Sequence, residues 1–273
     1  MRKFKIKKVI LNLFGIAVGL ISLFPLLWMA ISGVKPEKEV LAVPFRFFPT
    51  KFVTDNYLKL IQEGMFFRSI AVTFFVAFVS VMLSLLINSM SAYVFARLEF
   101  PFKKYLWAYE IVTMFIPNIA ILITSFVVVA KLGMLDSLSV LIVPGLATGY
   151  NIFFIRQFYL NIPSSIEEAA LIDGANRFQT YVHIFLPLSK SPFVIVGVST
   201  FLGYWNSYIW PAMTISNQKL FQVMQVIALF KGTYASQWGR IMAASTLAAI
   251  PTILLFLVFQ KHILQGIKIS GIK

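Results

Sequence analysis

Six long apolar runs divide this sequence, and they constrain its fold more than any other feature. The runs cover about residues 9–34, 69–95, 105–130, 138–159, 193–215 and 241–263. A bilayer core about 30 Å thick is crossed by roughly 20 apolar residues in an α-helix, which satisfies its own backbone hydrogen bonds. The pattern therefore predicts an all-α membrane protein with six transmembrane helices.

The amino-acid composition supports a membrane protein and excludes several classes of function. The chain is 59% hydrophobic and 12% charged, with a mean hydropathy of +0.84, which is too apolar for a soluble core and its surface. A net charge of +14 would suggest nucleic acid in a soluble protein. Here the lysines and arginines lie between apolar runs, where they set topology and contact anionic headgroups. The absence of cysteine excludes disulfides, and two histidines argue against a zinc site.

Basic residues also predict the orientation. Residues 1–8 form a basic tail, and the following run is longer than the apolar part of a signal peptide, about 7–15 residues, so we interpret it as retained. With this tail inside, 14 of the 24 lysines and arginines lie on the inner side. We expect both termini in the cytoplasm, a transmembrane domain over 9–265 with an external loop at 35–67, and a cytoplasmic tail at 266–273.

The segment 162–187 is a polar-containing stretch between the fourth and fifth apolar runs, and it is predicted to form two short helices. Ser164 and Glu167 have the spacing of a capping box, so a helix should begin near Ser164. Gly174 should end it in a left-handed backbone conformation, and a second helix should end near Pro187.

This segment also carries a motif. It fits the pattern EAA-x3-G-x9-I-x-LP at all seven specified positions. The matching residues are Glu168, Ala169, Ala170, Gly174, Ile184, Leu186 and Pro187. The motif resembles the coupling loop of permease subunits of ATP-binding-cassette (ABC) importers, and its place between the fourth and fifth apolar runs is the context expected for it.

The resemblance extends along the chain. Further similarity to carbohydrate ABC importer permeases, the group that includes the smaller permease of the maltose importer, lies in residues 92–101, 131–136, 156–158, 205–206 and 251–260. It implies a type I importer permease fold with a cytoplasmic coupling helix, in a bacterial-type cytoplasmic (inner) membrane. It also implies a second homologous permease, two cytoplasmic ATPase subunits that bind ATP and Mg²⁺, and an extracellular or periplasmic solute-binding protein.

The resemblance assigns ATPase coupling to the 162–187 segment. A short helix held by each ATPase subunit would transmit its closure as a rigid body. The expected coupling residues are Glu167, Glu168, Ala169, Ala170, Asp173, Gly174, Leu186 and Pro187. The sequence has no GxxxxGK[ST] motif, so ATP hydrolysis is assigned to a partner chain, and no cofactor or metal is expected in this one.

Polar groups within the apolar runs are candidates for a substrate pathway. They are Asn118, Tyr204, Trp205, Asn206, Tyr208 and Glu110. Aromatic rings stack on sugars and amides bond hydroxyls, as a neutral polyol requires. Packing between spans is the alternative for Trp205 and Asn206, and pairing with Lys103 or Lys104 is the alternative for Glu110.

Other functions remain open at this point. An enzyme would draw on Glu167, Glu168, Asp173 and His183, but their spacing does not bring the carboxylates together on one helical face. A channel or secondary transporter is a second alternative. We predict a non-catalytic permease for a sugar or oligosaccharide, with another polar solute such as glycerol phosphate or a peptide as the alternative substrate.

Overall fold

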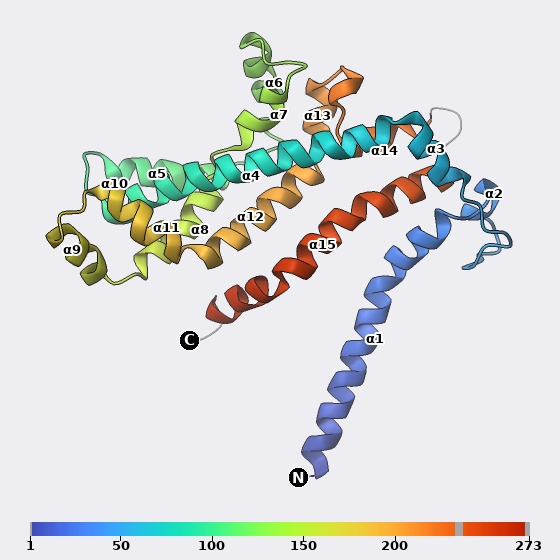
Figure 1. Ribbon diagram of the computed structural model, residues 1–273, viewed down its shortest axis with the longest axis horizontal. Helices are drawn as coiled ribbons and strands as arrows, with labels where there is room; N and C mark the ends of the chain where they lie inside the picture. Colours follow the sequence, from blue (N-terminus) through green and yellow to red (C-terminus); the bar gives the residue numbers. More distant parts are fainter. Residues whose placement is uncertain (1, 233–236, 271–273) are drawn as a thin grey trace. The chain divides into compact units, whose positions relative to one another are not determined.

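The regular secondary structure of the described residues is helical. The computed structural model describes the backbone of residues 2–232 and 237–270, and the side chains of residues 8, 10–232 and 237–262. Across these ranges there are helices and no strands, which confirms the all-α prediction (Figure 1). The chain divides into two compact units, Met1–Arg68 with Val226–Pro251 and Ser69–Gln225 with Thr252–Lys273.

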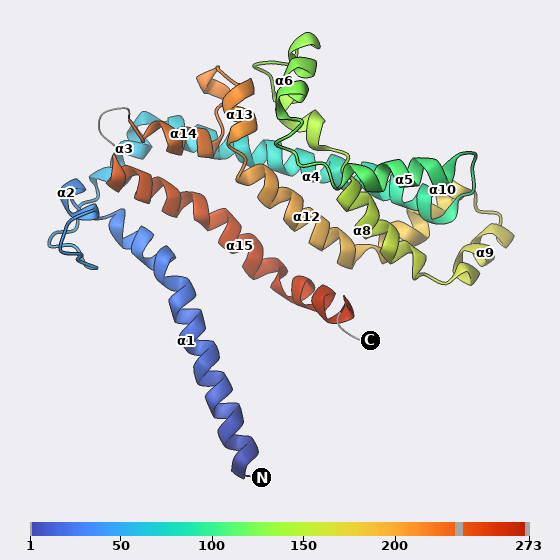
Figure 2. The same cartoon turned by 180° about the vertical axis from the view of Figure 1, so that it is seen from behind.

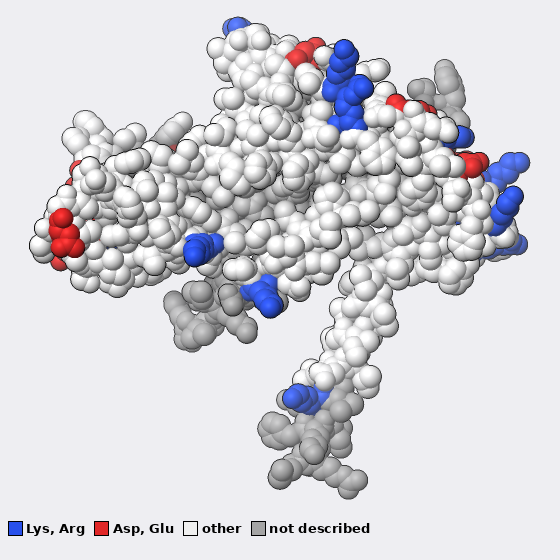
Figure 3. Space-filling model, viewed as in Figure 1, with Lys and Arg blue, Asp and Glu red and all other residues white. Residues whose placement is uncertain are grey.

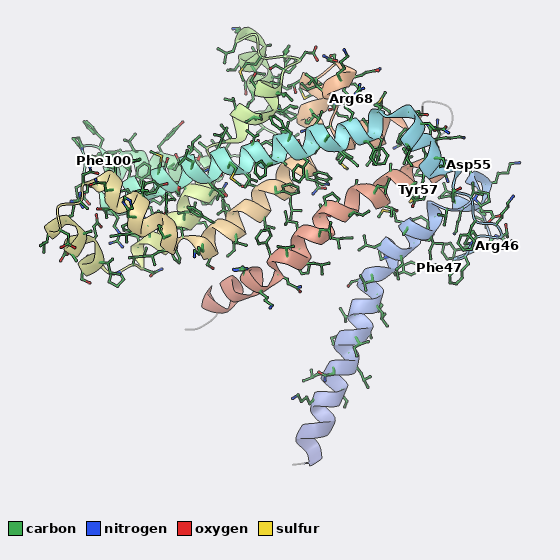
Figure 4. All side chains as sticks on the ribbon, in the orientation of Figure 1. Arg46, Phe47, Asp55, Tyr57, Arg68 and Phe100 are labelled. Carbon is green, nitrogen blue, oxygen red and sulfur yellow. The ribbon has the colours of Figure 1, made fainter. Side chains whose placement is uncertain are left out.

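The first unit joins the predicted external loop to the start of the last long helix. Its elements are α1 (Arg2–Ser32), α2 (Glu37–Val40), α3 (Asp55–Glu63) and the beginning of α15 (Trp238–Ser270). The Glu37 carboxylate accepts hydrogen bonds from the amides of Trp238 (2.5 Å) and Gly239 (2.9 Å), which open α15. Phe47, in the irregular stretch before α3, stacks on Phe24 of α1 with 5.6 Å between ring centres (Figure 4). The loop is therefore an ordered part of this unit.

The remaining helices belong to the second unit, except that the first four residues of α4 and the last four of α14 belong to the first. They are α4 (Met65–Arg97), α5 (Lys103–Thr113), α6 (Leu122–Lys131), α7 (Leu138–Ile142), the 3₁₀ turn η1 (Val143–Gly145), α8 (Gly149–Leu160), α9 (Ser164–Ile172), α10 (Arg177–Thr180), the π-helical turn η2 (Tyr181–Phe185), α11 (Leu186–Leu188), α12 (Lys190–Trp205), α13 (Ile209–Thr214), η3 (Gln218–Leu220) and α14 (Val223–Leu229), which runs into the first unit. Helix α8 packs against α5 and α12, and α13 packs against α6 and α7 (Figures 1 and 2).

The predicted count of six spans stays a prediction. Within the described residues, three helices are long and apolar enough to cross a membrane: Ile10–Ser32, Met65–Arg97 and Trp238–His262. The number is up to five if each of two bent pairs counts as one span, Leu138–Gly145 with Gly149–Leu160 at 46° and Arg177–Leu188 with Lys190–Trp205 at 77°. The expected third run, 105–130, is α5 and α6 separated by a non-helical stretch that contains Pro117.

Side chains of other helices satisfy the backbone where the α7–α8 pair breaks. Asn88 of α4, which is fully buried, donates to the Leu146 carbonyl (2.7 Å) and accepts from the Thr148 amide (3.0 Å). Tyr204 and Trp210 donate to carbonyls of α7, those of Ile142 (3.1 Å) and Val140 (2.9 Å). A broken helix is tolerated in an apolar environment when its freed backbone groups find such partners.

Candidate functional site

Helix α9 begins where the sequence predicts, but its cap differs from the prediction. The predicted capping box of Ser164 and Glu167 is wrong, because Pro163 is the N-cap residue and no side chain caps the helix. Ser164 is therefore the first helical residue, and Glu167 lies one position beyond the third position that a box requires. The Glu167 carboxylate is buried and pairs with Arg97 and Arg177 instead.

The end of α9 confirms the predicted role of Gly174 in the backbone. Gly174 has φ +86°, the left-handed region that favours glycine. Its amide donates to the Leu171 carbonyl (3.1 Å), and the Ala175 amide donates to the Ala170 carbonyl (2.9 Å). These two bonds form a Schellman motif, which satisfies the last carbonyls of the helix and reverses the chain sharply.

The second helical stretch of the segment starts with a capping box that the sequence analysis missed. Asn176 accepts from the Gln179 amide, and the Gln179 side chain accepts from the Asn176 amide, both at 2.8 Å. The Asn-x-x-Gln spacing was the available signal. The stretch runs through α10, η2 and α11 to Leu188, one residue past the predicted end at Pro187.

Buried aromatic rings hold this second stretch against α4 and α8. Tyr93 of α4 lies 4.8 Å from Phe185 and 5.4 Å from Tyr181 between ring centres, and Tyr159 of α8 lies 5.1 Å from Phe185. The hydroxyls of Tyr181 and Ser89 are 2.7 Å apart. All four rings are nearly inaccessible, so the stretch is part of the core of the second unit.

The other predicted coupling residues lie mostly on the free surface of the segment. Glu168, Ala169, Asp173, Gly174 and Pro187 are exposed, and Ala170 and Leu186 are half-buried. Acidic side chains are visible over α9 at the left of Figure 3.

Two large apolar side chains that the sequence analysis did not select lie on the same segment. Ile172, the last residue of α9, is 85% exposed, and Phe178 of α10 is 63% exposed. Both are large apolar residues in a polar segment, on either side of Gly174, and this pattern could have marked them as candidates for an exposed interaction surface. The free surface thus combines apolar side chains with acidic ones.

The predicted pathway residues fall into two groups. Trp205 is 1% exposed and stacks on Phe201 of the same helix with 5.5 Å between ring centres. The half-buried Tyr204 bonds to the Ile142 carbonyl and so joins α12 to α7. Asn206 and Tyr208 are exposed at the end of α12.

The remaining two candidates lie around the third apolar run. Asn118 is exposed in the stretch between α5 and α6, and Glu110 is half-buried on α5. Lys103, one alternative partner of Glu110, instead pairs with Glu99 at 2.9 Å.

The acidic groups and His183 of the 162–187 segment do not assemble an enzyme site. Glu167 is held by arginines, Glu168 and Asp173 are exposed, and His183 Nδ1 contacts the Gln179 carbonyl (2.9 Å). Among the described residues, no three histidine, aspartate or glutamate side chains are grouped so that they could hold a metal ion.

Long apolar helices joined by a polar, two-helix segment define a multi-span membrane protein. Residues 89–269 match the sequence model of the family described as "Binding-protein-dependent transport system inner membrane component", and the chain belongs to this family.

Relatives align over almost the whole chain. The arabinooligosaccharides transport system permease protein AraQ of Bacillus subtilis is 26% identical over 278 residues, 99% of this chain and 98% of the relative. The sn-glycerol-3-phosphate transport system permease protein UgpE of Escherichia coli is 30% identical over 263 residues, 93% and 92% of the two chains. The lactose transport system permease protein LacG of Rhizobium radiobacter is 24% identical over 248 residues, 90% and 89%.

A solved structure shares the fold. It is described as a bacterial ABC transporter involved in the import of the acidic polysaccharide alginate, and it superposes with a TM-score of 0.82 at 21% identity, over 96% of this chain and 98% of that one. The chain therefore has the type I ABC importer permease fold. It is a non-catalytic permease subunit of a binding-protein-dependent importer.

Proposed function

We propose that this chain forms half of the translocation pathway of an ATP-driven importer for a sugar or oligosaccharide, and that the ATPase docks on the 162–187 segment. The observation that carries the docking role is the free surface of α9 and α10. It exposes the apolar side chains of Ile172 and Phe178 on the same short segment as the acidic residues Glu168 and Asp173. Exposed apolar side chains with a polar rim are typical of a protein interaction site.

The proposed assembly pairs this chain with a second homologous permease, two ATPase subunits and an extracellular or periplasmic binding protein. The ATPase subunits bind ATP and Mg²⁺. The domain 9–265 has six spans, with α5 and α6 together forming the third, and an external loop at 35–67. Segments 1–8, 162–187 and 266–273 lie in the cytoplasm.

The substrate class rests on the relatives. Two of them are named for arabinooligosaccharides and lactose. In this chain the exposed amide of Asn206 and the exposed ring of Tyr208 offer the hydrogen bonding and stacking that a sugar needs. We therefore propose these two residues as the first choices for the pathway, with Asn118, Glu110, Tyr204 and Trp205 behind them.

A glycine pair tests the docking role. Gly174 and Gly133 both have positive φ, +86° and +67°, and a Cβ added at either would meet no atom within 4 Å. Aspartate tolerates this backbone region better than most residues, at a cost of about 1 kcal/mol. Gly174→Asp adds bulk and charge to the docking surface, so uptake should fall to background while the subunit stays in the membrane. Gly133→Asp carries the same strain elsewhere and should keep uptake. Normal uptake by Gly174→Asp would contradict the docking role.

Import of another polar solute is the second candidate, favoured by the 30% identity to the glycerol-3-phosphate permease. A binding assay with the purified binding protein of the same importer distinguishes the two candidate substrates. The protein should bind labelled oligosaccharide if the importer carries a sugar. A channel or secondary transporter would take up solute without the partner ATPase.

A further inference from the structure

The acidic side chains in α9 and at its C-cap face two ways. Glu168 and Asp173 are exposed, whereas Glu167, one residue from the motif, is 7% exposed. Burying a carboxylate costs solvation free energy, which opposite charges and hydrogen bonds have to offset. Glu167 therefore acts on groups inside this chain rather than on a docked ATPase.

Three side chains surround the Glu167 carboxylate. Arg177 Nη1 lies 2.6 Å from Oε1, the Tyr93 hydroxyl donates to Oε1 at 3.4 Å, and Arg97 Nε lies 3.8 Å from Oε2. Arg177 belongs to the following helix α10, whereas Tyr93 and Arg97 belong to the end of α4. One carboxylate thus connects α9 both to its neighbour in the segment and to a long helix 70 residues earlier in the sequence.

Arg97 is fixed at the same place by other contacts. Its Nη2 donates to the Tyr159 carbonyl (2.5 Å), in the last turn of α8, and to the Ile162 carbonyl just before α9. Its guanidinium also lies over the Phe185 ring, 5.2 Å from the ring centre. Carbonyls at a helix C-terminus lack intrahelical partners and carry partial negative charge. The arginine provides both a hydrogen-bond donor and a positive charge at this helix end. The α8–α9 connection is consequently fastened to the last residue of α4.

We propose that Glu167 is a positioning residue for energy coupling: it ties the docking helix α9 to α4, so that a displacement of α9 moves α4 with it. This inference rests on the proposed docking role. Asn88, which holds the break between η1 and α8, lies nine residues before Arg97 on the same helix, about 14 Å along its axis. The tie and this break are therefore connected by one continuous helix. Without the tie, the ATPase still docks and hydrolyses ATP, but α9 moves relative to α4 and less solute is transported.

The test compares two glutamate-to-glutamine variants in the importer assembled with its partner chains and binding protein in liposomes. Glu167→Gln removes the buried charge. Glu99→Gln is the matched control. Glu99 lies two residues beyond Arg97, and its exposed carboxylate pairs with Lys103. Solute taken up per ATP hydrolysed should fall about tenfold for Glu167→Gln, in the usual range of coupling free energies, and stay unchanged for Glu99→Gln. A ratio within about twofold of wild type in Glu167→Gln overturns the inference.

A cysteine pair separates a tie from general stability and also decides the matter if Glu167→Gln fails to fold. The sequence contains no cysteine, so Arg97→Cys with Glu167→Cys introduces the only two thiols of this subunit. A short reversible bifunctional crosslinker should restore uptake per ATP, and reduction should remove it again. A crosslinked pair that stays uncoupled refutes the tie. If Gly174→Asp transports normally, the docking proposal fails; if Gly174→Asp is inactive while Glu167→Gln is fully coupled, only the positioning role fails.

Discussion

Replacing Asn88 by alanine should destabilise the second unit through the break between η1 and α8. The side chain is fully buried and has two tertiary bonds, to the Leu146 carbonyl at 2.7 Å and from the Thr148 amide at 3.0 Å. Its amide nitrogen also contacts Ser84 of its own helix, 2.6 Å from the carbonyl and 2.8 Å from the hydroxyl. Alanine removes all of these bonds and leaves two backbone groups of a broken helix without a protein partner.

The magnitude follows from the two tertiary bonds. Hydrogen bonds between membrane helices contribute about 0.6 kcal/mol on average and about 1.7 kcal/mol at most. A net hydrogen bond in a soluble protein contributes about 0.5–1.5 kcal/mol. We count only these two bonds, because the contacts with Ser84 lie within α4 itself. We therefore expect Asn88→Ala to lower the free energy of unfolding by about 2 kcal/mol.

The assay is reversible unfolding of the purified subunit in mixed micelles, titrated with a denaturing detergent. Ser91→Ala is the matched control, since Ser91 lies on the same helix and donates only to the Ile87 carbonyl of that helix, at 2.9 Å. It should change the free energy of unfolding by less than about 0.5 kcal/mol. Equal stability of Asn88→Ala and wild type, or an equal loss in both variants, would refute the reasoning.

Two more substitutions test local caps. Asn176→Ala removes the capping box with Gln179 and should cost about 1 kcal/mol of unfolding free energy, measured in the same titration. Glu37→Ala removes the acceptor of the Trp238 and Gly239 amides, so hydrogen exchange at these two amides should accelerate about tenfold, which corresponds to about 1.4 kcal/mol.

Each of these has a control. Asn161→Ala removes an exposed bond to the Gln157 carbonyl and should leave stability unchanged; a loss as large as that of Asn176→Ala would argue against the box. Glu63→Ala removes a partly exposed ion pair with Arg240 in the same unit. It should not alter exchange at Trp238 and Gly239, and unchanged exchange in Glu37→Ala itself would contradict its capping role.

Much of the fold could be predicted from local patterns. Hydrophobic runs located α1, α4 and the membrane part of α15, because the cost of unpaired backbone in an apolar phase leaves a helix as the structure for a long apolar segment. The runs alone do not decide whether 138–159 and 105–130, which contain Pro144 and Pro117, form continuous or interrupted helices. A break depends on whether distant side chains, such as Asn88, Tyr204 and Trp210, are available to satisfy the freed backbone groups.

In the 162–187 segment, too, some properties follow from neighbouring residues and others from tertiary contacts. The sequence by itself determined that α9 begins near Ser164, that Gly174 turns the chain, and that the motif marks a permease, because these properties depend on neighbouring residues and backbone conformation. Only the tertiary structure decided that Glu167 faces inward while Glu168 faces outward. Adjacent glutamates are alike in sequence, and the burial of one of them depends on Arg97, which α4 and α8 bring to it from 70 residues away.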